Sequence, residues 1–279
     1  MWEVLAPSFA ACIVLTGIHC YLGIHVVMRG VIFVDLALAQ IAAMGAAVAT
    51  LLHYDLHSPQ AYACSLLFTF FGAAVFAVGR FKDRRVPQEA IIGIVYAVSS
   101  AVAILIITHS PVDADEIESM LVGHLLYTDW SDVLKTLLIY SGVAALHYAL
   151  RRRFFAISKS VDAAHAAGLR VHLWDLIFYM SFGLVVTSSV QLAGVLLVFS
   201  FLVVPAVCAM MFFDTVARRL MAGWGFGLLA SIGGLAASAT WDLPTGAAVV
   251  ATFGVLLLGC AAVYFVSHRN RAGKSAAPA

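Results

Sequence analysis

The stretch from Arg151 to Asp175, RRRFFAISKSVDAAHAAGLRVHLWD, is the longest basic interruption in an otherwise apolar chain. Three consecutive arginines end one hydrophobic segment, and the next hydrophobic run begins at Leu173. Between them, the alanine-rich residues 161–167 predict a short helix that stops at Gly168, because glycine readily adopts the backbone conformation that ends helices. The stretch is therefore either a compact helix on the basic side of a membrane or a solvated loop that fixes topology.

The composition of the whole chain is that of an integral membrane protein. Of its 279 residues, 63% are hydrophobic and 11% are charged, and the mean hydropathy is +0.98. Soluble domains carry roughly a quarter charged residues, so a water-soluble globular fold is excluded. The five cysteines lie in apolar runs without a C-x-x-C pair. They are expected to be small buried side chains rather than disulfides or soft-metal ligands.

Apolar runs that are long enough to cross a membrane, which needs about 20 helical residues, recur along the chain. The longest run has no clear break, and we divide it at Ser188–Gln191. The predicted crossings lie near 7–28, 31–52, 60–79, 88–108, 133–150, 172–190, 191–213, 220–240 and 245–267. The predicted fold is an all-α, polytopic membrane bundle of about 8–9 transmembrane helices. We expect one domain over residues 1–268 and a short, disordered cytoplasmic tail over 269–279.

Lysine and arginine are sorted between the two sides of this crossing pattern. With the N-terminus outside, every lysine and arginine except Lys135 falls on one side. Cytoplasmic loops are the ones that collect these residues. The segments predicted to be cytoplasmic are 80–86, 151–172, 214–219 and the C-terminus, and those predicted to face outward are 53–59, 109–132 and 241–244.

The outward segments are acidic and also contain histidines. The residues concerned are Glu3, Asp55, Asp113, Asp115, Glu116, Glu118, Asp129, Asp132 and Asp242, together with His53, His57, His109 and His124. Carboxylates and imidazoles are ligands for divalent first-row metals, so this side suits the approach of a cation. The alternative is that outer loops simply tolerate acidic residues. These residues have no spacing typical of a metal site, so both interpretations stay open.

Ionisable residues inside the crossings are costly in lipid and indicate function. Asp35 lies in the second crossing, and Gln40 follows five residues later, about 140° away around a helix, so the two do not share a face. The alternatives for Asp35 are a hydrogen bond to a neighbouring helix or an ion pair with Arg29. Glu89 and Asp175 open the fourth and sixth crossings near the basic interface, where a helix N-terminus favours a carboxylate. We interpret both as caps and anchors.

His19, His25 and His147 are interpreted as hydrogen-bonded packing residues, with a role in transport as the alternative. Enzyme signatures such as H-E-x-x-H and G-x-S-x-G are missing. Gly273-Lys274-Ser275 resembles the end of a phosphate loop, but neither the first glycine nor a following helix is present. We therefore expect a subunit that is not an enzyme and has no nucleotide-binding motif of its own.

Two runs in the C-terminal half resemble permeases of metal-ion ABC importers, the manganese, zinc and iron uptake systems of bacteria. One is Gln191–Met211, QLAGVLLVFSFLVVPAVCAMM, with Pro205, and the other is WDLPTGAA at 241–248, with Asp242, Pro244 and Gly246. The resemblance also covers Arg29–Gly45, EAIIGIV at 89–95 with Glu89 and Gly93, and Gly123–Leu126 with Trp130–Asp132. Only about the last ten residues fall outside it.

The resemblance implies a fold, a cellular location and partners. Such permeases are similar to the membrane subunits of vitamin B12 and siderophore importers, known as type II importers, and lie in the bacterial inner membrane. They pair with a second copy or a paralogous permease, are driven by cytoplasmic ATP-binding subunits, and receive the ion from an extracytoplasmic metal-binding protein. No nucleic-acid partner and no permanently bound cofactor is implied, only a transported divalent metal ion. The run Asp162, Ala163, Ala164, His165 to Gly168 matches the coupling helix that docks into the ATPase.

One departure from the family pattern affects the ion path. Many members carry an Asp and a His four residues apart in the second crossing. Aligned without gaps, the His position falls on Gln40 and the Asp position on Leu36, with Asp35 one residue early. Asp35 and Gln40 are therefore the candidate ion-path residues, and either the ion is held more weakly or another group substitutes.

Several functions remain open at this point. The alternatives to a metal-ion permease are a permease for a metal chelate or another small solute, and a secondary transporter without an ATPase. An intramembrane enzyme is disfavoured because no nucleophile and base occur at helical spacing.

Overall fold

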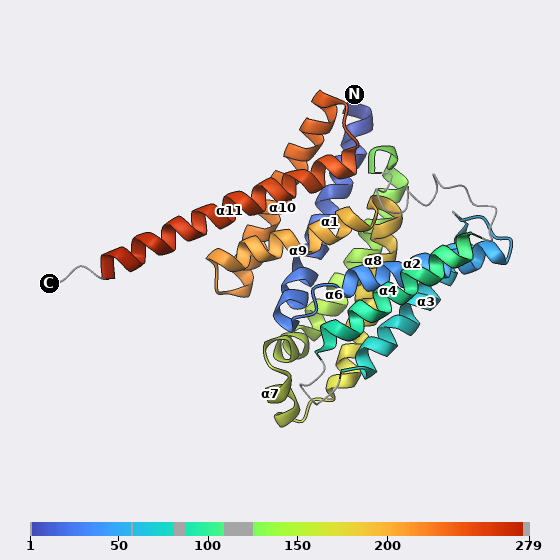
Figure 1. The fold of residues 1–279 in the computed structure, drawn as a ribbon, viewed down its shortest axis with the longest axis horizontal. Coiled ribbons are helices and arrows are strands. Elements are labelled where there is room, and N and C mark those ends of the chain that lie inside the picture. Colours follow the sequence, from blue (N-terminus) through green and yellow to red (C-terminus); the bar gives the residue numbers. More distant parts are fainter. Residues whose placement is uncertain (1, 57, 81–86, 109–124, 276–279) are drawn as a thin grey trace.

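The computed structural model describes residues 2–56, 58–80, 87–108 and 125–275, and every element in these ranges is helical (Figure 1). The elements are α1 (Trp2–Arg29), α2 (Val34–Leu51), α3 (Pro59–Val78), α4 (Gln88–Ile107), η1 (Leu125–Tyr127), α6 (Trp130–Lys159), α7 (Val161–Ala166), α8 (Val171–Ala193), α9 (Val195–Phe212), α10 (Val216–Trp241) and α11 (Thr245–Ser275). Within the described ranges, nine helices are long and apolar enough to cross a membrane. The prediction of an all-α multi-pass bundle is confirmed.

The predicted break in the longest apolar run is wrong by a few residues. Ser188 and Ser189 lie inside α8, where their hydroxyls donate to the carbonyls of Leu184 and Val185, so they do not interrupt the helix. The chain turns instead at Gly194, whose φ of 75° lies in the region that favours glycine. The two polar serines did not mark a helix end, because a helix can accept hydrogen bonds from serine hydroxyls with its own carbonyl oxygens.

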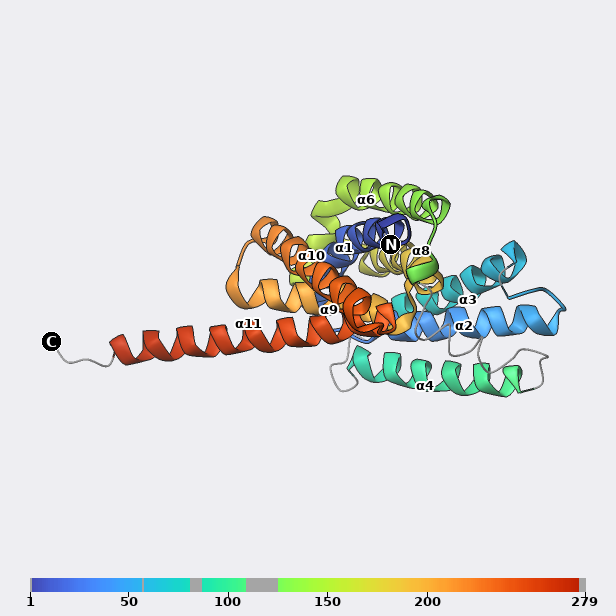
Figure 2. The same cartoon turned by 90° about the horizontal axis from the view of Figure 1, so that it is seen from above.

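Helices α6 and α11 extend furthest beyond their predicted crossings. Helix α6 does not end at the three arginines but continues to Lys159, so the basic residues lie on its last turns. Helix α11 continues to Ser275 and extends away from the rest of the bundle (Figures 1 and 2). It thus runs past residue 268, where we placed the domain boundary, and that division stays a prediction.

Helix α1 is the centre of one half of the bundle, where it packs against α6, α9 and α10, while α2 packs against α3 and α4. Helix α8 joins the halves through contacts with α3, α6 and α2. At Gly23 of α1, a Cβ atom would lie 1.8 Å from the carbonyl oxygen of Leu202 in α9. Small residues let helices approach this closely in lipid, so α1 and α9 meet backbone to backbone.

Contacts between the described helix ends group them at two ends of the bundle, in agreement with the two sides predicted from lysine and arginine. At one end of the bundle, the C-terminal residue of α1, the segment after α3, and the second turn of α8 meet through Arg29, Arg80 and Asp175. At the other end, the start of α3 meets the end of α8, where Tyr62 and Ser188 are hydrogen-bonded at 2.8 Å. Helices α2 and α3 therefore carry the chain from Arg29 to the other end of the bundle and back to Arg80.

The sidedness of the membrane gives a direct test. Lys159 lies at the end of α6, is exposed, and belongs to the end predicted to be cytoplasmic. In a background without native cysteines, Lys159→Cys should resist a membrane-impermeant thiol reagent in intact cells and react after permeabilisation. Trp241 is exposed and is the last residue of α10, in a segment predicted to face outward. A cysteine at this position should react in intact cells. Strong labelling of position 159 from outside would reverse the assigned orientation.

Candidate ion site and coupling helix

Asp35 lies in the first turn of α2, closer to the helix end than the predicted crossing placed it. The residue is only 2% exposed, and its Oδ1 atom is buried without a hydrogen-bond partner among the described residues. The proposed pairing with Arg29 is wrong, because Arg29 binds Asp175 instead. Among the described residues, Asp35 is thus a buried carboxylate with no positively charged group in contact.

Glu89 reaches from α4 to the beginning of α2. Its Oε1 atom accepts the backbone N–H of Phe33 at 3.1 Å, and Phe33 is the residue that precedes α2. Glu89 thus lies in the first turn of its own helix, as expected, but its hydrogen bond caps the neighbouring helix, where the dipole also favours negative charge. Its other oxygen, Oε2, is buried and unpartnered within the described ranges.

Gln40 does not join this pair of carboxylates. It lies on α2 and is half-buried, one and a half turns beyond Asp35, in agreement with the expectation that the two residues occupy different faces. The role of either residue in an ion path stays a prediction.

A buried ion cluster at the same end of the bundle was missed by the sequence analysis. Asp175 Oδ1 lies 2.7 Å from Arg29 Nη1 and its Oδ2 lies 3.1 Å from Arg80 Nη1. The Asp175 side chain is fully buried, and the Arg29 guanidinium stacks 3.9 Å from the centre of the Phe178 ring. Asp175 is therefore an ion-pair partner of two arginines and not the helix cap that we predicted.

The same cluster reaches the end of α6. The hydroxyl oxygen of Ser158 accepts a hydrogen bond from Arg29 Nε at 2.9 Å and is also bonded to His25 Nδ1 at 2.8 Å. Ser158 lies two residues before the N-cap of α7. The position of the short helix is thus coupled to that of α1.

The buried histidines are hydrogen-bonded, as predicted. The Nδ1–H group of His19 donates to the carbonyl of Leu15 at 2.8 Å, and its Nε2 contacts the hydroxyl of Ser189. His147 Nε2 lies 2.8 Å from the hydroxyl of Ser181. These contacts tie α1 and α6 to α8.

The predicted short helix is confirmed as α7, and its two ends explain why it forms. The Ser160 hydroxyl accepts the N–H of Ala163 at 3.2 Å, which satisfies one donor of the first turn. At the other end Gly168 has a φ of 77°, and the N–H groups of Gly168 and Leu169 donate to the carbonyls of His165 and Ala164. This pair of bonds is the Schellman motif, which requires the left-handed conformation at Gly168.

Helix α7 is anchored on one face and open on the other. Ala164 packs into a small apolar cluster with Ile157 of α6 and Val171 of α8. Asp162, Ala163 and His165 are exposed. Helix α7 lies at one end of the molecule (Figure 1), and its exposed side chains are those outside the apolar cluster.

The remaining family-motif residues lie on other elements than Asp35. Pro205 is buried inside α9. Asp242 follows α10 with a φ of 52°, Pro244 precedes α11, and Gly246 lies in the first turn of α11. Gly93 lies in α4, and a Cβ there would meet nothing within 4 Å. These residues shape turns and helix faces rather than one site.

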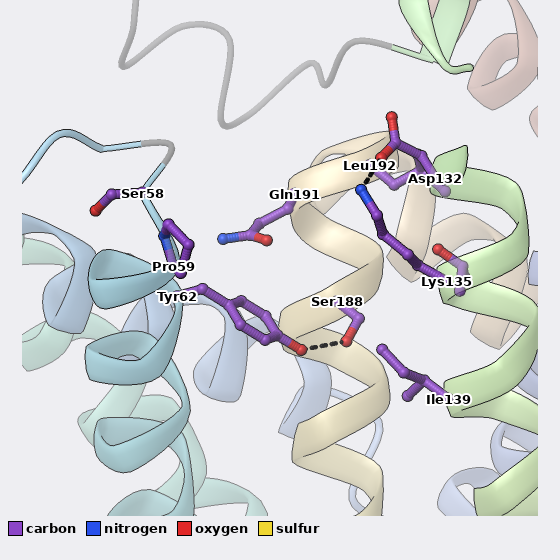
Figure 3. Close-up of a pocket in the computed structure, with 10 residues that line it drawn as sticks. Ser58, Pro59, Tyr62, Asp132, Lys135, Ile139, Ser188, Gln191 and Leu192 are labelled. Carbon is purple, nitrogen blue, oxygen red and sulfur yellow. Dashed lines mark hydrogen bonds and ion pairs between the residues drawn. The ribbon is translucent and has the colours of Figure 1, made fainter. Parts of the chain in front are cut away.

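The opposite end of the bundle carries a cavity of about 460 Å³ between α3, α6 and α8 (Figure 3). Its wall contains Lys135, which is 3.2 Å from Asp132, and the Tyr62–Ser188 hydrogen bond. Nearby, Asp129 accepts the backbone N–H of Asp132 at 2.9 Å, and this bond lowers the pKa of Asp129. The structure describes neither His57 nor residues 109–124, so the expectation of an acidic, histidine-rich outer side is only partly placed.

The profile of the ABC 3 transport family matches residues 1–264, nearly the whole of this bundle. This chain belongs to the ABC 3 transport family. The ABC 3 chain is 26% identical over 230 residues to the manganese transport system membrane protein MntC of Listeria innocua, covering 82% of this chain and 79% of that one. It is also 26% identical over 259 residues to the high-affinity zinc uptake system membrane protein ZnuB of Haemophilus influenzae, covering 90% and 94%.

A solved structure has the same fold. The ABC 3 chain superposes with a TM-score of 0.77 on PsaBC from Streptococcus pneumoniae in complex with Fab, over 92% of this chain and 91% of that one. The sequence identity is 19%, so this likeness concerns the arrangement of helices alone. The family resemblance and the fold expected from it are therefore confirmed.

Proposed function

We propose that this ABC 3 chain is the membrane-spanning permease subunit of an ABC importer for divalent transition-metal ions in the bacterial inner membrane. The observation that supports it most is its similarity, over most of its length, to membrane proteins named for manganese and for zinc transport. The multi-pass helical bundle fits the same role. Energy would come from ATP hydrolysed on a separate subunit, and the metal ion is the transported substrate rather than a cofactor.

The proposed partners follow from the two ends of the bundle. Helix α7, with Asp162 and His165 turned away from the apolar cluster at Ala164, would dock into a cytoplasmic ATP-binding subunit. An extracytoplasmic metal-binding protein would deliver the ion to the opposite end. A second copy of the chain, or a paralogous permease, would complete the transporter.

Asp35→Asn tests the ion path of this proposed function. The variant keeps the shape and hydrogen-bonding capacity of the side chain but removes its charge. We expect it to assemble with the ATPase at wild-type levels and to lose at least about tenfold in manganese uptake, the loss that follows removal of groups around a metal. Uptake of radioactive manganese by whole cells, across a range of concentrations, measures this effect.

The control is Asp214→Asn, because Asp214 is an exposed carboxylate on the turn between α9 and α10. It should transport like the wild type. Wild-type uptake rates for Asp35→Asn at every concentration would show that the charge is not needed. Transport by a wild-type chain that purifies and works without any ATPase would instead indicate a secondary transporter.

A further inference from the structure

We infer that Asp35 and Glu89 bind the transported cation together, as one two-carboxylate site at the beginning of α2. This inference rests on the proposed function and names the group that replaces the family's histidine. Glu89 comes from α4, so the second ligand is supplied by a neighbouring helix instead of by the next turn of α2.

The two carboxylates are held at the same helix end by different contacts. Glu89 is fixed by the N–H of Phe33 at 3.1 Å, and Asp35 lies two residues further along the chain in the first turn of α2. Both side chains therefore lie at the beginning of α2. Helices α2 and α4 pack along their lengths, so this proximity is fixed by the fold.

Each carboxylate keeps one oxygen that no described residue satisfies. These are Asp35 Oδ1 and Glu89 Oε2, both shielded from solvent. A buried carboxylate oxygen without a donor or a cation is strongly unfavourable, and two neighbouring negative charges add to the cost. The pair therefore needs a positive partner, which can be a proton shared by the two carboxylates or a bound cation.

The described protein groups do not supply that partner. Arg29, the nearest arginine along the chain, is bound to Asp175, and Arg80 approaches the same aspartate. The positive end of the α2 dipole stabilises the Glu89 oxygen that accepts the N–H group. Among the described residues it leaves Asp35 Oδ1 and Glu89 Oε2 without a hydrogen-bond partner. A transported cation bound between these two oxygens would account for both.

The ligand set also indicates which ions the site favours. Carboxylate oxygens supplemented by water suit Mn²⁺, whereas imidazole nitrogen suits Zn²⁺. With Gln40 at the position of the family's histidine, no imidazole is supplied from α2. We therefore expect this site to hold Mn²⁺ through oxygen atoms alone.

Mn²⁺ binding to the purified permease–ATPase complex tests the inference. Free Mn²⁺ is measured by its electron paramagnetic resonance signal for the wild type, Asp35→Asn, Glu89→Gln and the double variant, with Asp214→Asn as the control. Glutamine at position 89 can still accept the N–H of Phe33, so the start of α2 is retained. Loss of an outer group near a metal typically weakens affinity about 10–100-fold, and each single variant should lose at least about tenfold.

Shared binding predicts that the losses do not add. Once one carboxylate is gone the ion is no longer held between the two, so the double variant should bind Mn²⁺ nearly as weakly as each single variant. Additive losses, or wild-type affinity in Glu89→Gln, would overturn the inference and leave Glu89 as a cap of α2.

A gain-of-function variant provides a second readout that does not depend on losing activity. Glu89→His places an imidazole beside Asp35 and should raise the affinity for Zn²⁺ relative to Mn²⁺, compared with the wild type. An unchanged ratio would argue that position 89 does not touch the ion. Manganese uptake is measured in parallel: if the wild type itself imports no metal, the proposed function fails, whereas wild-type import with unaffected variants rejects only the paired site.

Discussion

Asp175→Asn should remove most of the folded permease from the membrane. Arg29 is completely buried beside Asp175, and Arg80 shares the same carboxylate. Removing one partner of a buried ion pair leaves an uncompensated charge and typically costs about 3–5 kcal/mol, a large part of the stability of a protein. The measurement is the amount of monodisperse protein on size-exclusion chromatography of detergent extracts, together with its thermal unfolding midpoint.

Two comparisons isolate the charge as the cause. Asp214→Asn removes an exposed carboxylate near the same end of the bundle and should leave yield and midpoint unchanged. The double variant Arg29→Met/Asp175→Leu should be more stable than Asp175→Asn alone, because it removes the fully buried cation and leaves only Arg80, whose side chain is partly exposed. A double variant that is less stable than either single change would contradict an electrostatic origin.

Gly168→Val should abolish transport and weaken binding of the ATPase while the permease remains in the membrane. A Cβ at Gly168 would meet no atom within 4 Å, so steric crowding does not enter. The cost comes from the backbone, since a φ of 77° disfavours an L-residue by roughly 1–2 kcal/mol and a β-branched one more. The end of α7 should therefore change its conformation, and with it the surface that is proposed to dock.

Gly168→Asn is the matched control for this effect. Asparagine tolerates the left-handed conformation, so this variant adds a side chain of comparable size without the same strain. It should retain most of the uptake and should copurify with the ATPase. Equal loss in both variants would show that any side chain placed in the space around Gly168 disrupts function, whatever its backbone preference. Normal uptake by Gly168→Val would favour the interpretation of the segment as a topology-setting loop.

The relation between sequence and fold is clearest in α7 and in the α8–α9 turn. Ser160, the alanines and Gly168 act on their immediate neighbours, so their order along the chain was sufficient to predict a short helix and its end. The α8–α9 break was misplaced because the polarity of the serine pair was taken as the sign of a helix end. Only the backbone shows that the serines bind their own helix while Gly194 turns the chain.

By itself, the sequence determined the class of this protein, its crossings and its charge sorting. Hydropathy and the distribution of lysine and arginine act segment by segment through the membrane, and no contact between helices is needed to read them. The partners of the buried charges were decided only by the tertiary structure. Arg29 meets Asp175 and Glu89 meets the start of α2 across 146 and 56 residues of chain. In lipid a buried charge binds whichever complementary group the packing brings within reach. The distance between the two groups depends on how the helices pack and cannot be predicted from the order of the residues.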